Sequence, residues 1–244
     1  MSKVEVRNLT KKFGDLLVLD KISFDVGDGE FLCIVGPTGC GKTTFLNSLT
    51  KIYDINEGSI QIDGENVDLH KHSLAYIMQE YSTMSWLNVR QNVAFGLEIK
   101  KLSKQDIAKK TDDALEMVGL TKFAEYYPSQ LSASMMQRVA IARAFAVEPD
   151  LLLMDEPYGQ LDLELRFKLE DELINLWRKL GTTVIFITHN IEEAVYLSER
   201  ILVLTNKPTT IKKSIQNTLP YPRKVTDEEF IKLREEVTAL IKWW

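Results

Sequence analysis

Cysteine is scarce in this sequence. The 244 residues include two, Cys33 and Cys40. Two cysteines so close together cannot form a disulfide framework, and without a histidine cluster nearby they cannot form a zinc site. We therefore predict that both are reduced thiols in a cytosolic protein.

Long hydrophobic runs are also lacking, and we expect no signal peptide. The chain contains no run of about 18 apolar residues, the length that a membrane-spanning helix needs. The first residues alternate between apolar and polar side chains, which predicts a β-strand. Any role at a membrane is therefore expected to depend on a partner protein.

Positive charge is in deficit. The chain has 30 Lys and Arg against 35 Asp and Glu, which gives a net charge of −5. This balance does not attract nucleic acid, so we expect no nucleic-acid partner. Hydrophobic residues make up 45% of the chain, as in ordinary globular proteins with a sizeable core.

Short apolar runs separated by helical patterns dominate the rest of the chain. Each run has the length of a strand that is buried on both faces. Residues 163–180 show one of the helical patterns between them. This alternation predicts an α/β fold with a mostly parallel sheet. The apolar runs cover residues 31–35, 151–154, 183–188 and 201–204.

Two segments differ from this alternation. Residues 88–146 carry small and charged side chains at helical spacing, which predicts an all-helical insertion. After a proline-marked loop, residues 226–244 carry apolar side chains at helical spacing. This pattern predicts an amphipathic helix that packs on its own domain. The apolar side chains are Phe230, Leu233, Val237, Leu240 and Trp244.

A glycine-rich motif, G-x-x-x-x-G-K-[ST], follows the first apolar run. Its glycines allow backbone N–H groups to surround phosphate oxygens, and the helix that follows points its positive end at them. Lys42 is expected to reach the β- and γ-phosphates, and the Thr43 hydroxyl to hold Mg²⁺. A bulky thiol reagent that labels Cys40 is expected to inhibit the protein, and bound ATP is expected to protect Cys40 from the reagent. The predicted ATP-binding residues are Gly36, Pro37, Thr38, Gly39, Cys40, Gly41, Lys42, Thr43 and Thr44.

Polar residues also end the second and third apolar runs. Asp155 is expected to enter the Mg²⁺ shell, and Glu156 to act as general base on an attacking water. Taken alone, Asp155 and Glu156 are explained equally well as the polar end of a strand that stops before Pro157. His189 follows the third run, at a strand end where ligands bind in α/β sheets. The residues alone leave open whether it contacts a γ-phosphate or is a surface histidine.

Together these motifs resemble the ABC ATPase family over nearly the whole chain. Gln79 stands at the position of the family's Q-loop glutamine, and His189 lies in ITHNIEEA, which resembles the H-loop. Residues 131–144, LSASMMQRVAIARA, resemble the signature LSGGQ-x-QRVAIARA. Residues 159–162, which end at Asp162, resemble the D-loop.

The resemblance implies a role for each of these positions. Phe13 is implied to stack on adenine, although its own pattern favours a core position. The implied catalytic residues are Gln79, Glu156 and His189. The implied metal ligands are Thr43, Gln79 and Asp155. The signature residues, implied to contact ATP held by a partner subunit, are Ser132, Ala133, Ser134 and Met135.

The resemblance also implies an organisation and partners. An ABC ATPase domain over 1–225 is expected to contain a P-loop NTPase core (1–87 and 147–225), with an antiparallel β subdomain, and a helical subdomain (88–146). ATP and Mg²⁺ are the implied cofactors. The implied partners are a second ATPase subunit, in a homo- or heterodimer, membrane permease subunits and an external solute-binding protein. The implied location is the cytoplasmic face of the cell membrane, held there by the permease.

Two segments most resemble the nitrate/sulfonate/taurine-type importer branch of the family, residues 79–93 and 205–223. Within the first, Trp86 is expected to be exposed and to line a groove for a permease helix. The competing interpretation is that Trp86 is buried within the helical insertion.

The signature departs from the family pattern. Ala133 and Ser134 replace two adjacent glycines, and Met136 stands where a polar or basic residue is usual. Neutral drift, a weakened composite ATP site and a deliberate substitution all remain open. The expected function is ATP hydrolysis that powers an importer. The alternatives are a nucleotide-gated binding subunit with weak hydrolysis and a soluble ABC ATPase of translation or DNA repair.

Overall fold

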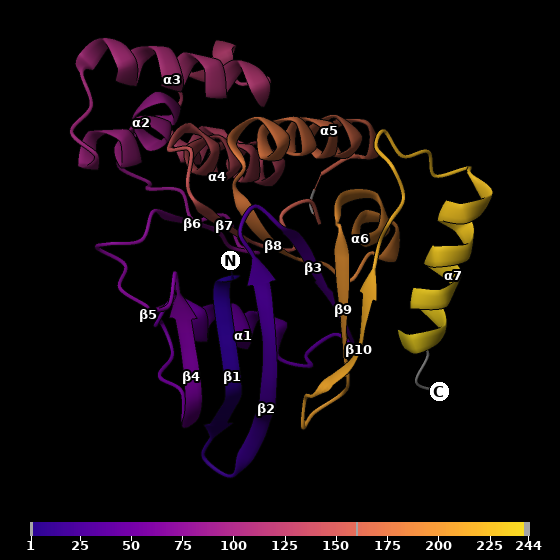
Figure 1. The fold of residues 1–244 in the computed structure, drawn as a ribbon. Coiled ribbons are helices and arrows are strands. Elements are labelled where there is room, and N and C mark those ends of the chain that lie inside the picture. The colour runs from indigo at the N-terminus through magenta and orange to yellow at the C-terminus, as the bar shows by residue number, and fades with distance from the viewer. Residues whose placement is uncertain (1, 160, 242–244) are drawn as a thin grey trace. The chain divides into compact units, whose positions relative to one another are not determined.

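The computed structural model of the protein describes residues 2–159 and 161–241 (Figure 1). The chain forms two compact units. Unit 1 consists of Met1–Ser73 and Thr183–Trp244, and unit 2 consists of Leu74–Thr182. Each unit has its own strands and helices.

Unit 1 contains an antiparallel sheet in the order β2-β1-β4-β5. Alternating side chains of β1 and β2 are buried, and Val4 pairs with Val26 while Val6 pairs with Phe24. Strands with this period of two bury one face and leave the other polar. The strands are β1 (Ser2–Phe13), β2 (Leu16–Gly27), β4 (Glu57–Ile62) and β5 (Glu65–Asn66).

A second group of strands in unit 1 is mostly parallel. The strand β3 (Phe31–Val35) lies between β8 (Thr183–Ile187) and β9 (Arg200–Leu204) and is parallel to both. The strand β10 (Ile211–Gln216) pairs antiparallel with β9. Every residue of β3 and β8 is buried, which explains why their sequences are continuous apolar runs.

Three helices complete unit 1: α1 (Lys42–Leu49), α6 (Ile191–Leu197) and α7 (Glu228–Ile241). The helix α7 packs against α6 and β9, and Phe230 and Val237 of its predicted apolar stripe are buried. Residues 242–244 of the predicted tail helix, Trp244 among them, lie outside the described residues.

Unit 2 combines two parallel strands with helices. The strand β6 (Leu74–Ile77) pairs with β7 (Leu151–Asp155), so that Ile77 lies opposite Met154. The helices α2, α3 and α4 pack on one another. The helices are α2 (Val89–Ile99), α3 (Lys104–Met117), η1 (Thr121–Phe123), η2 (Pro128–Gln130), α4 (Ala133–Ala146) and α5 (Leu163–Leu180).

The predicted fold class is confirmed: the chain is α/β, with mostly parallel strands, an antiparallel sheet and helices. Each of the apolar runs is a strand. The segment 88–146, which is described throughout, contains helices and turns and no strand. Its extent as a separate subdomain stays a prediction, because β6, β7 and α5 belong to the same compact unit.

No helix among residues 2–159 and 161–241 is both long and apolar enough to cross a membrane.

Candidate functional site

The glycine-rich loop connects β3 to α1 in unit 1, and its backbone conformation requires glycine at two positions. Gly39 has φ 75° and Gly41 has φ 116°, values that side chains disfavour. A Cβ atom on Gly41 would lie 2.9 Å from Val18 and 3.0 Å from Leu19. A Cβ atom on Gly39 would meet nothing within 4 Å, so a ligand can approach the backbone there. Packing against Val18 and Leu19 therefore requires glycine at position 41, whereas the space beside Gly39 is open to a ligand.

The start of α1 is suited to an anion. Its N-cap residue, Gly41, makes no side-chain cap, and the first turn holds no acidic residue. The free N–H groups of this turn and the helix dipole both favour negative charge. The Lys42 ammonium, which is 5% exposed, donates to the carbonyl oxygens of Gly36 (2.9 Å) and Pro37 (3.0 Å). Lys42 is thus held across the loop into which phosphate would bind.

Thr209 lies far from the loop in the sequence but supports it, and no sequence pattern indicates this role. It is fully buried, and its hydroxyl donates to the carbonyl oxygen of Cys40. Its backbone joins β2 through hydrogen bonds with Val18 and Asp20, each 2.9 Å long. Thr209 therefore ties the phosphate loop to the antiparallel sheet.

Phe13, the predicted adenine-stacking residue, lies at the end of β1. Its side chain is 43% exposed, so the core position that its own pattern favoured is wrong. The ring of Tyr53 meets it edge-on at 5.3 Å between centroids, and the Lys11 ammonium lies 4.7 Å from the Phe13 ring centroid. Phe13 thus has an exposed ring available for stacking, and Tyr53 is a second aromatic that sequence reasoning missed.

His189 lies in the connection between β8 and α6 of unit 1, where its side chain is exposed. Its neighbour Thr188 is buried, and Asn190 caps α6 by accepting N–H groups from Glu192 and Glu193. The histidine is therefore presented to solvent by a loop that is anchored on both sides.

In unit 2, the structure brings Gln79 and Glu156 together. The parallel strands β6 and β7 end side by side, and the next residues emerge at the same edge. The Gln79 Nε2 atom donates to Glu156 Oε2 over 3.4 Å, a long hydrogen bond. Asp155, the last residue of β7, is 1% exposed. Two predicted catalytic residues are thus neighbours, although 77 positions separate them.

The backbone of Glu156 is strained. Its φ is 46°, in the left-handed region that a residue with a large side chain rarely adopts, and proline follows it. Such outliers occur often at functional sites, where the surrounding structure holds them. This conformation supports a specific function for the Glu156 carboxylate over a simple strand end.

The signature motif forms the start of α4. Ser132 is the N-cap residue, and its hydroxyl accepts the N–H of Met135 at 3.2 Å. Ala133 and Ser134 are the first helical residues, and neither has a positive φ. The turn therefore does not require glycine at these positions for backbone conformation. Only a close approach to a ligand would favour glycine there.

Two residues of α4 that sequence reasoning did not single out hold the neighbouring loops. Gln137 donates to the carbonyl oxygens of Pro157 (3.0 Å) and Met78 (3.5 Å). Arg143 donates to the backbone and side-chain oxygens of Ser82, at 2.8 and 2.7 Å, and burial lowers its pKa. The signature helix is thereby linked to the segments that carry Gln79 and Glu156.

Asp162 has a structural role in addition to its predicted D-loop assignment. It is the N-cap of α5, where its carboxylate accepts the N–H of Leu165 at 3.0 Å. Gln160, the second residue of the predicted D-loop, lies outside the described residues.

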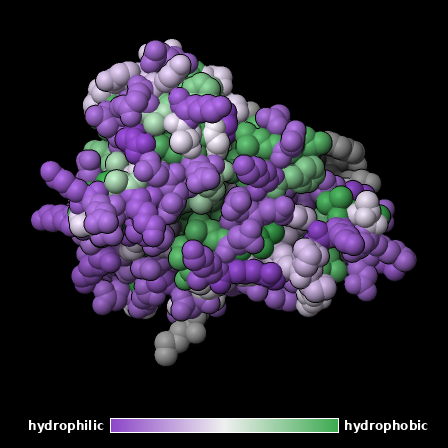
Figure 2. All heavy atoms as spheres, turned by 90° about the horizontal axis from the view of Figure 1, so that it is seen from above, coloured by the Kyte–Doolittle hydropathy of each residue, from purple (hydrophilic) through white to green (hydrophobic). Residues whose placement is uncertain are grey.

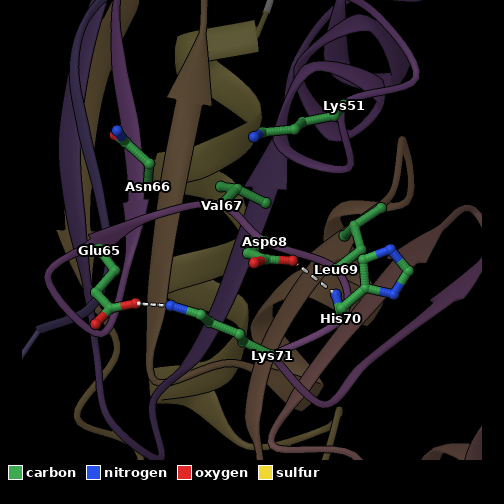
Figure 3. A pocket seen from close by; sticks show the side chains of 8 residues that line it. All are labelled: Lys51, Glu65, Asn66, Val67, Asp68, Leu69, His70 and Lys71. Atoms are coloured by element: carbon green, nitrogen blue, oxygen red, sulfur yellow. Dashed lines mark hydrogen bonds and ion pairs between the residues drawn. The ribbon is translucent and has the colours of Figure 1, made fainter.

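A cavity of about 530 Å³ lies beside the end of α1 (Figure 3). Lys71 pairs with Glu65 at 3.1 Å, and the Asp68 carboxylate accepts the backbone N–H of His70 at 2.9 Å. No polar side chain that lines it is buried. The cavity therefore has no features of a built ligand site. Among the described residues, no group of three or more His, Cys, Asp or Glu could hold a metal ion.

A glycine-rich loop between a buried strand and an uncapped helix start, with a lysine held across it, is typical of P-loop nucleoside-triphosphate-binding proteins. Comparison with known proteins narrows this class. A family model described as ABC transporter matches residues 19–159.

Two relatives align over almost the whole chain. The uncharacterized ABC transporter ATP-binding protein MJ0412 of Methanocaldococcus jannaschii is 41% identical, over 98% of this chain and 91% of its own length. The aliphatic sulfonates import ATP-binding protein SsuB of Bacillus cereus is 41% identical, over 93% of this chain and 90% of its own.

A solved structure agrees with these relatives. The dimeric structure of a post-hydrolysis state of the ATP-binding cassette MJ0796, bound to ADP and Pi, superposes with a TM-score of 0.81 at 30% identity. The match covers 89% of this chain and all of that one. The chain belongs to the ABC transporter ATP-binding family and is an ATPase of the ABC type.

The accessibility of Cys40 provides a test of the loop geometry. Its side chain is 2% exposed, and burial raises its pKa, opposed by the charge of Lys42. Burial also raises the pKa of Cys33. The thiolate is the reactive form, so we expect both thiols in the folded protein to react with Ellman's reagent at least ~10-fold more slowly than in guanidinium chloride.

A Cys33→Ser variant isolates Cys40 in this assay, and Cys40→Ser is the matched control. Because the folded-state pKa is raised, the labelling rate should keep increasing with pH above the range in which a free thiol levels off. Rapid stoichiometric labelling of folded Cys33→Ser at neutral pH would contradict the buried position. The ready inhibition by a bulky reagent that the loop sequence predicted is therefore not expected.

Proposed function

We propose that the chain is the ATP-hydrolysing subunit of an ABC importer and works as one half of a dimer that closes on ATP. The observation that carries the proposal is the Gln79–Glu156 pair at the edge of β6 and β7, beside a buried Asp155. An ATPase requires a general base and a metal-binding carboxylate, and in this proposal Glu156 and Asp155 take these two roles.

In this proposal, the phosphate loop and Lys42 bind the phosphates of ATP, and Phe13 stacks on adenine. Asp155, Gln79 and Thr43 offer a carboxylate, an amide oxygen and a hydroxyl, the hard oxygen donors that suit Mg²⁺. When bound, Mg²⁺ would neutralise charge on the phosphate oxygens.

Hydrolysis is assigned to Glu156 and His189. Glu156 takes a proton from the water that attacks the γ-phosphorus, while the bond from that phosphorus to the bridging oxygen of ADP breaks. His189 contacts the γ-phosphate, and Lys42 stabilises the negative charge that develops on the leaving ADP.

The dimer follows from the family and from the dimeric cassette that this chain resembles. In the proposed dimer, Ser132 to Met135 and the start of α4 contact the ATP that the partner subunit holds, because a helix N-terminus favours phosphate.

The importer assignment rests on relatives such as the aliphatic sulfonates import ATP-binding protein SsuB. We propose permease subunits and an external solute-binding protein as partners, and the cytoplasmic face of the cell membrane as the location. The altered signature favours a second candidate, a nucleotide-gated subunit with weak hydrolysis. Measurement of ATP turnover in the assembled complex distinguishes the two.

We expect Glu156→Gln to lower turnover by at least ~10²-fold while ATP still binds, because the amide cannot accept the proton of the attacking water. The variant should also accumulate an ATP-bound dimer. Steady-state ATPase assays and sedimentation measure both effects.

The matched control is Asp150→Asn, which removes an exposed carboxylate at the other end of β7. It should retain full activity. Near-normal turnover of Glu156→Gln, with contaminating ATPase excluded, would remove Glu156 from the role of base.

The segment that contains Trp86 is a candidate docking surface for the permease. Trp86 is 73% exposed, so the alternative of a buried position is wrong. The buried Asn92 side chain organises the loop, accepting the N–H of Met84 at 2.8 Å and donating to the carbonyl of Leu87 at 2.9 Å. On the face drawn in Figure 2, hydrophilic side chains cover most of the surface and hydrophobic ones appear in patches. An indole exposed this far is consistent with contact to a partner.

We expect Trp86→Ala to abolish transport while the isolated subunit still folds and binds ATP, because little buried surface is lost. Transport by the reconstituted complex and ATP affinity of the subunit are the measurements. Ile99→Ala, at the other end of α2 and 66% exposed, is the control. Full transport by Trp86→Ala, with normal assembly, would contradict the assignment.

The signature can be restored by the double change Ala133→Gly and Ser134→Gly. We expect faster ATP turnover or stronger ATP-driven dimerisation, since the added Cβ atoms hinder a close approach to phosphate. Helix α4 should lose roughly 0.5–1 kcal/mol of stability per glycine. Equal or slower turnover and unchanged dimerisation would identify the substitutions as neutral drift.

A further inference from the structure

The connection that carries His189 is built around a buried carboxylate. Thr188 is 2% exposed and Glu193 is 6% exposed, whereas His189 between β8 and α6 faces solvent. The Thr188 hydroxyl donates to Glu193 Oε2 at 2.6 Å, the short distance of a charge-assisted hydrogen bond. The Asn190 side chain donates to Glu193 Oε1 at 3.4 Å. The two oxygens of one carboxylate thus bind the residues on either side of His189.

This arrangement differs from an ordinary helix cap. In a capping box, the acidic residue in the first turn would accept the backbone N–H of the N-cap residue. Here the N–H of Asn190 is donated to the Thr188 hydroxyl at 2.9 Å, and the Glu193 carboxylate is directed to side chains instead. Burial of a carboxylate is costly, so a helix of seven residues would be capped more cheaply by Asn190 alone. The geometry fits a role in fixing the loop.

The helix that carries Glu193 is itself immobilised at its other end. The buried guanidinium of Arg223 donates to the carbonyl oxygens of Val195, Tyr196 and Ser198 at 2.8 to 2.9 Å. The Asn217 amide adds bonds to Val195 (2.8 Å) and Ser198 (2.9 Å). The helix α7 also contacts α6 (Figure 1). Because α6 is held in place by these contacts, Glu193 can fix the position of the loop that carries His189.

We propose that Glu193 is a positioning residue for His189. Its carboxylate locks Thr188 and Asn190 and thereby fixes the backbone on which the imidazole is carried. The assignment of His189 to the γ-phosphate rests on the proposed function above, but the positional effect of Glu193 does not.

The chain allows a direct test, because it contains three histidines, His70, His72 and His189. His70 lines the cavity of Figure 3, His72 follows two residues later in the chain, and both serve as internal references. We expect Glu193→Ala to shift or broaden the ring signals of His189 in NMR spectra of histidine-labelled protein, while the other two stay in place. The His189→Ala variant identifies the signal.

Activity provides the second readout. Glu193→Ala should lower kcat about 10-fold or more with little change in the KM for ATP, because a misplaced catalytic group slows chemistry while the phosphate loop is unaffected. Glu193→Gln keeps an acceptor for the Thr188 hydroxyl and should restore most of the activity and the His189 signal. Thr188→Val should resemble Glu193→Ala, and the double variant should be no worse than either.

Glu192→Gln is the matched control. Glu192 is the preceding residue on α6, half exposed and paired with Arg234 of α7 at 3.2 Å. The Glu192→Gln variant should leave the His189 signal and kcat unchanged. If Glu193→Ala does not fold, Glu193→Gln and Thr188→Val decide the question by the same two readouts.

An unchanged His189 signal in folded Glu193→Ala or Thr188→Val would overturn the proposal. The proposal would also fail if Glu193→Ala lowered kcat by the same factor in the His189→Ala background as in the wild-type protein. The effect of Glu193 would then not act through the histidine. If His189→Ala itself retains full turnover, the role of His189 in hydrolysis fails, and the NMR result still decides the positioning role.

Discussion

The proposed phosphate binding by the loop between β3 and α1 depends on a backbone turn that leaves N–H groups open to an anion. Gly39 and Gly41 make this turn in the left-handed region. Gly41 also packs against Val18 and Leu19 too closely for a side chain, so the antiparallel sheet fixes the shape of the loop. Thr209 reinforces the same connection through Cys40. Tertiary contacts therefore hold the phosphate loop from both sides, and Lys42 lies in a loop whose shape is already fixed.

The proposed catalytic residues of unit 2 are also positioned by tertiary structure. Parallel pairing of β6 and β7 makes their ends coincide, which is why Gln79 and Glu156 meet. Gln137 binds both of the loops that continue from these ends. The signature helix, the Q-loop and the end of β7 are thus one hydrogen-bonded assembly.

The altered signature shows how a departure from a motif should be weighed. Ala133 and Ser134 lie in the first turn of a regular helix, capped by Ser132, and their backbone does not require glycine. The N–H groups of the helix start are properties of the backbone and remain in place whatever the side chains. The substitution therefore changes the space in front of these donors, and it does not remove them.

The sequence by itself determined the fold class and the phosphate loop. Continuous apolar runs such as 31–35 and 183–188 have the length and composition of strands buried on both faces, and the glycine-lysine motif has few other uses. Only the tertiary structure decided that Phe13 is exposed, that Thr209 supports the loop and that Glu193 holds the residues beside His189. These properties depend on contacts between distant segments and on burial, whereas a sequence pattern records only local spacing.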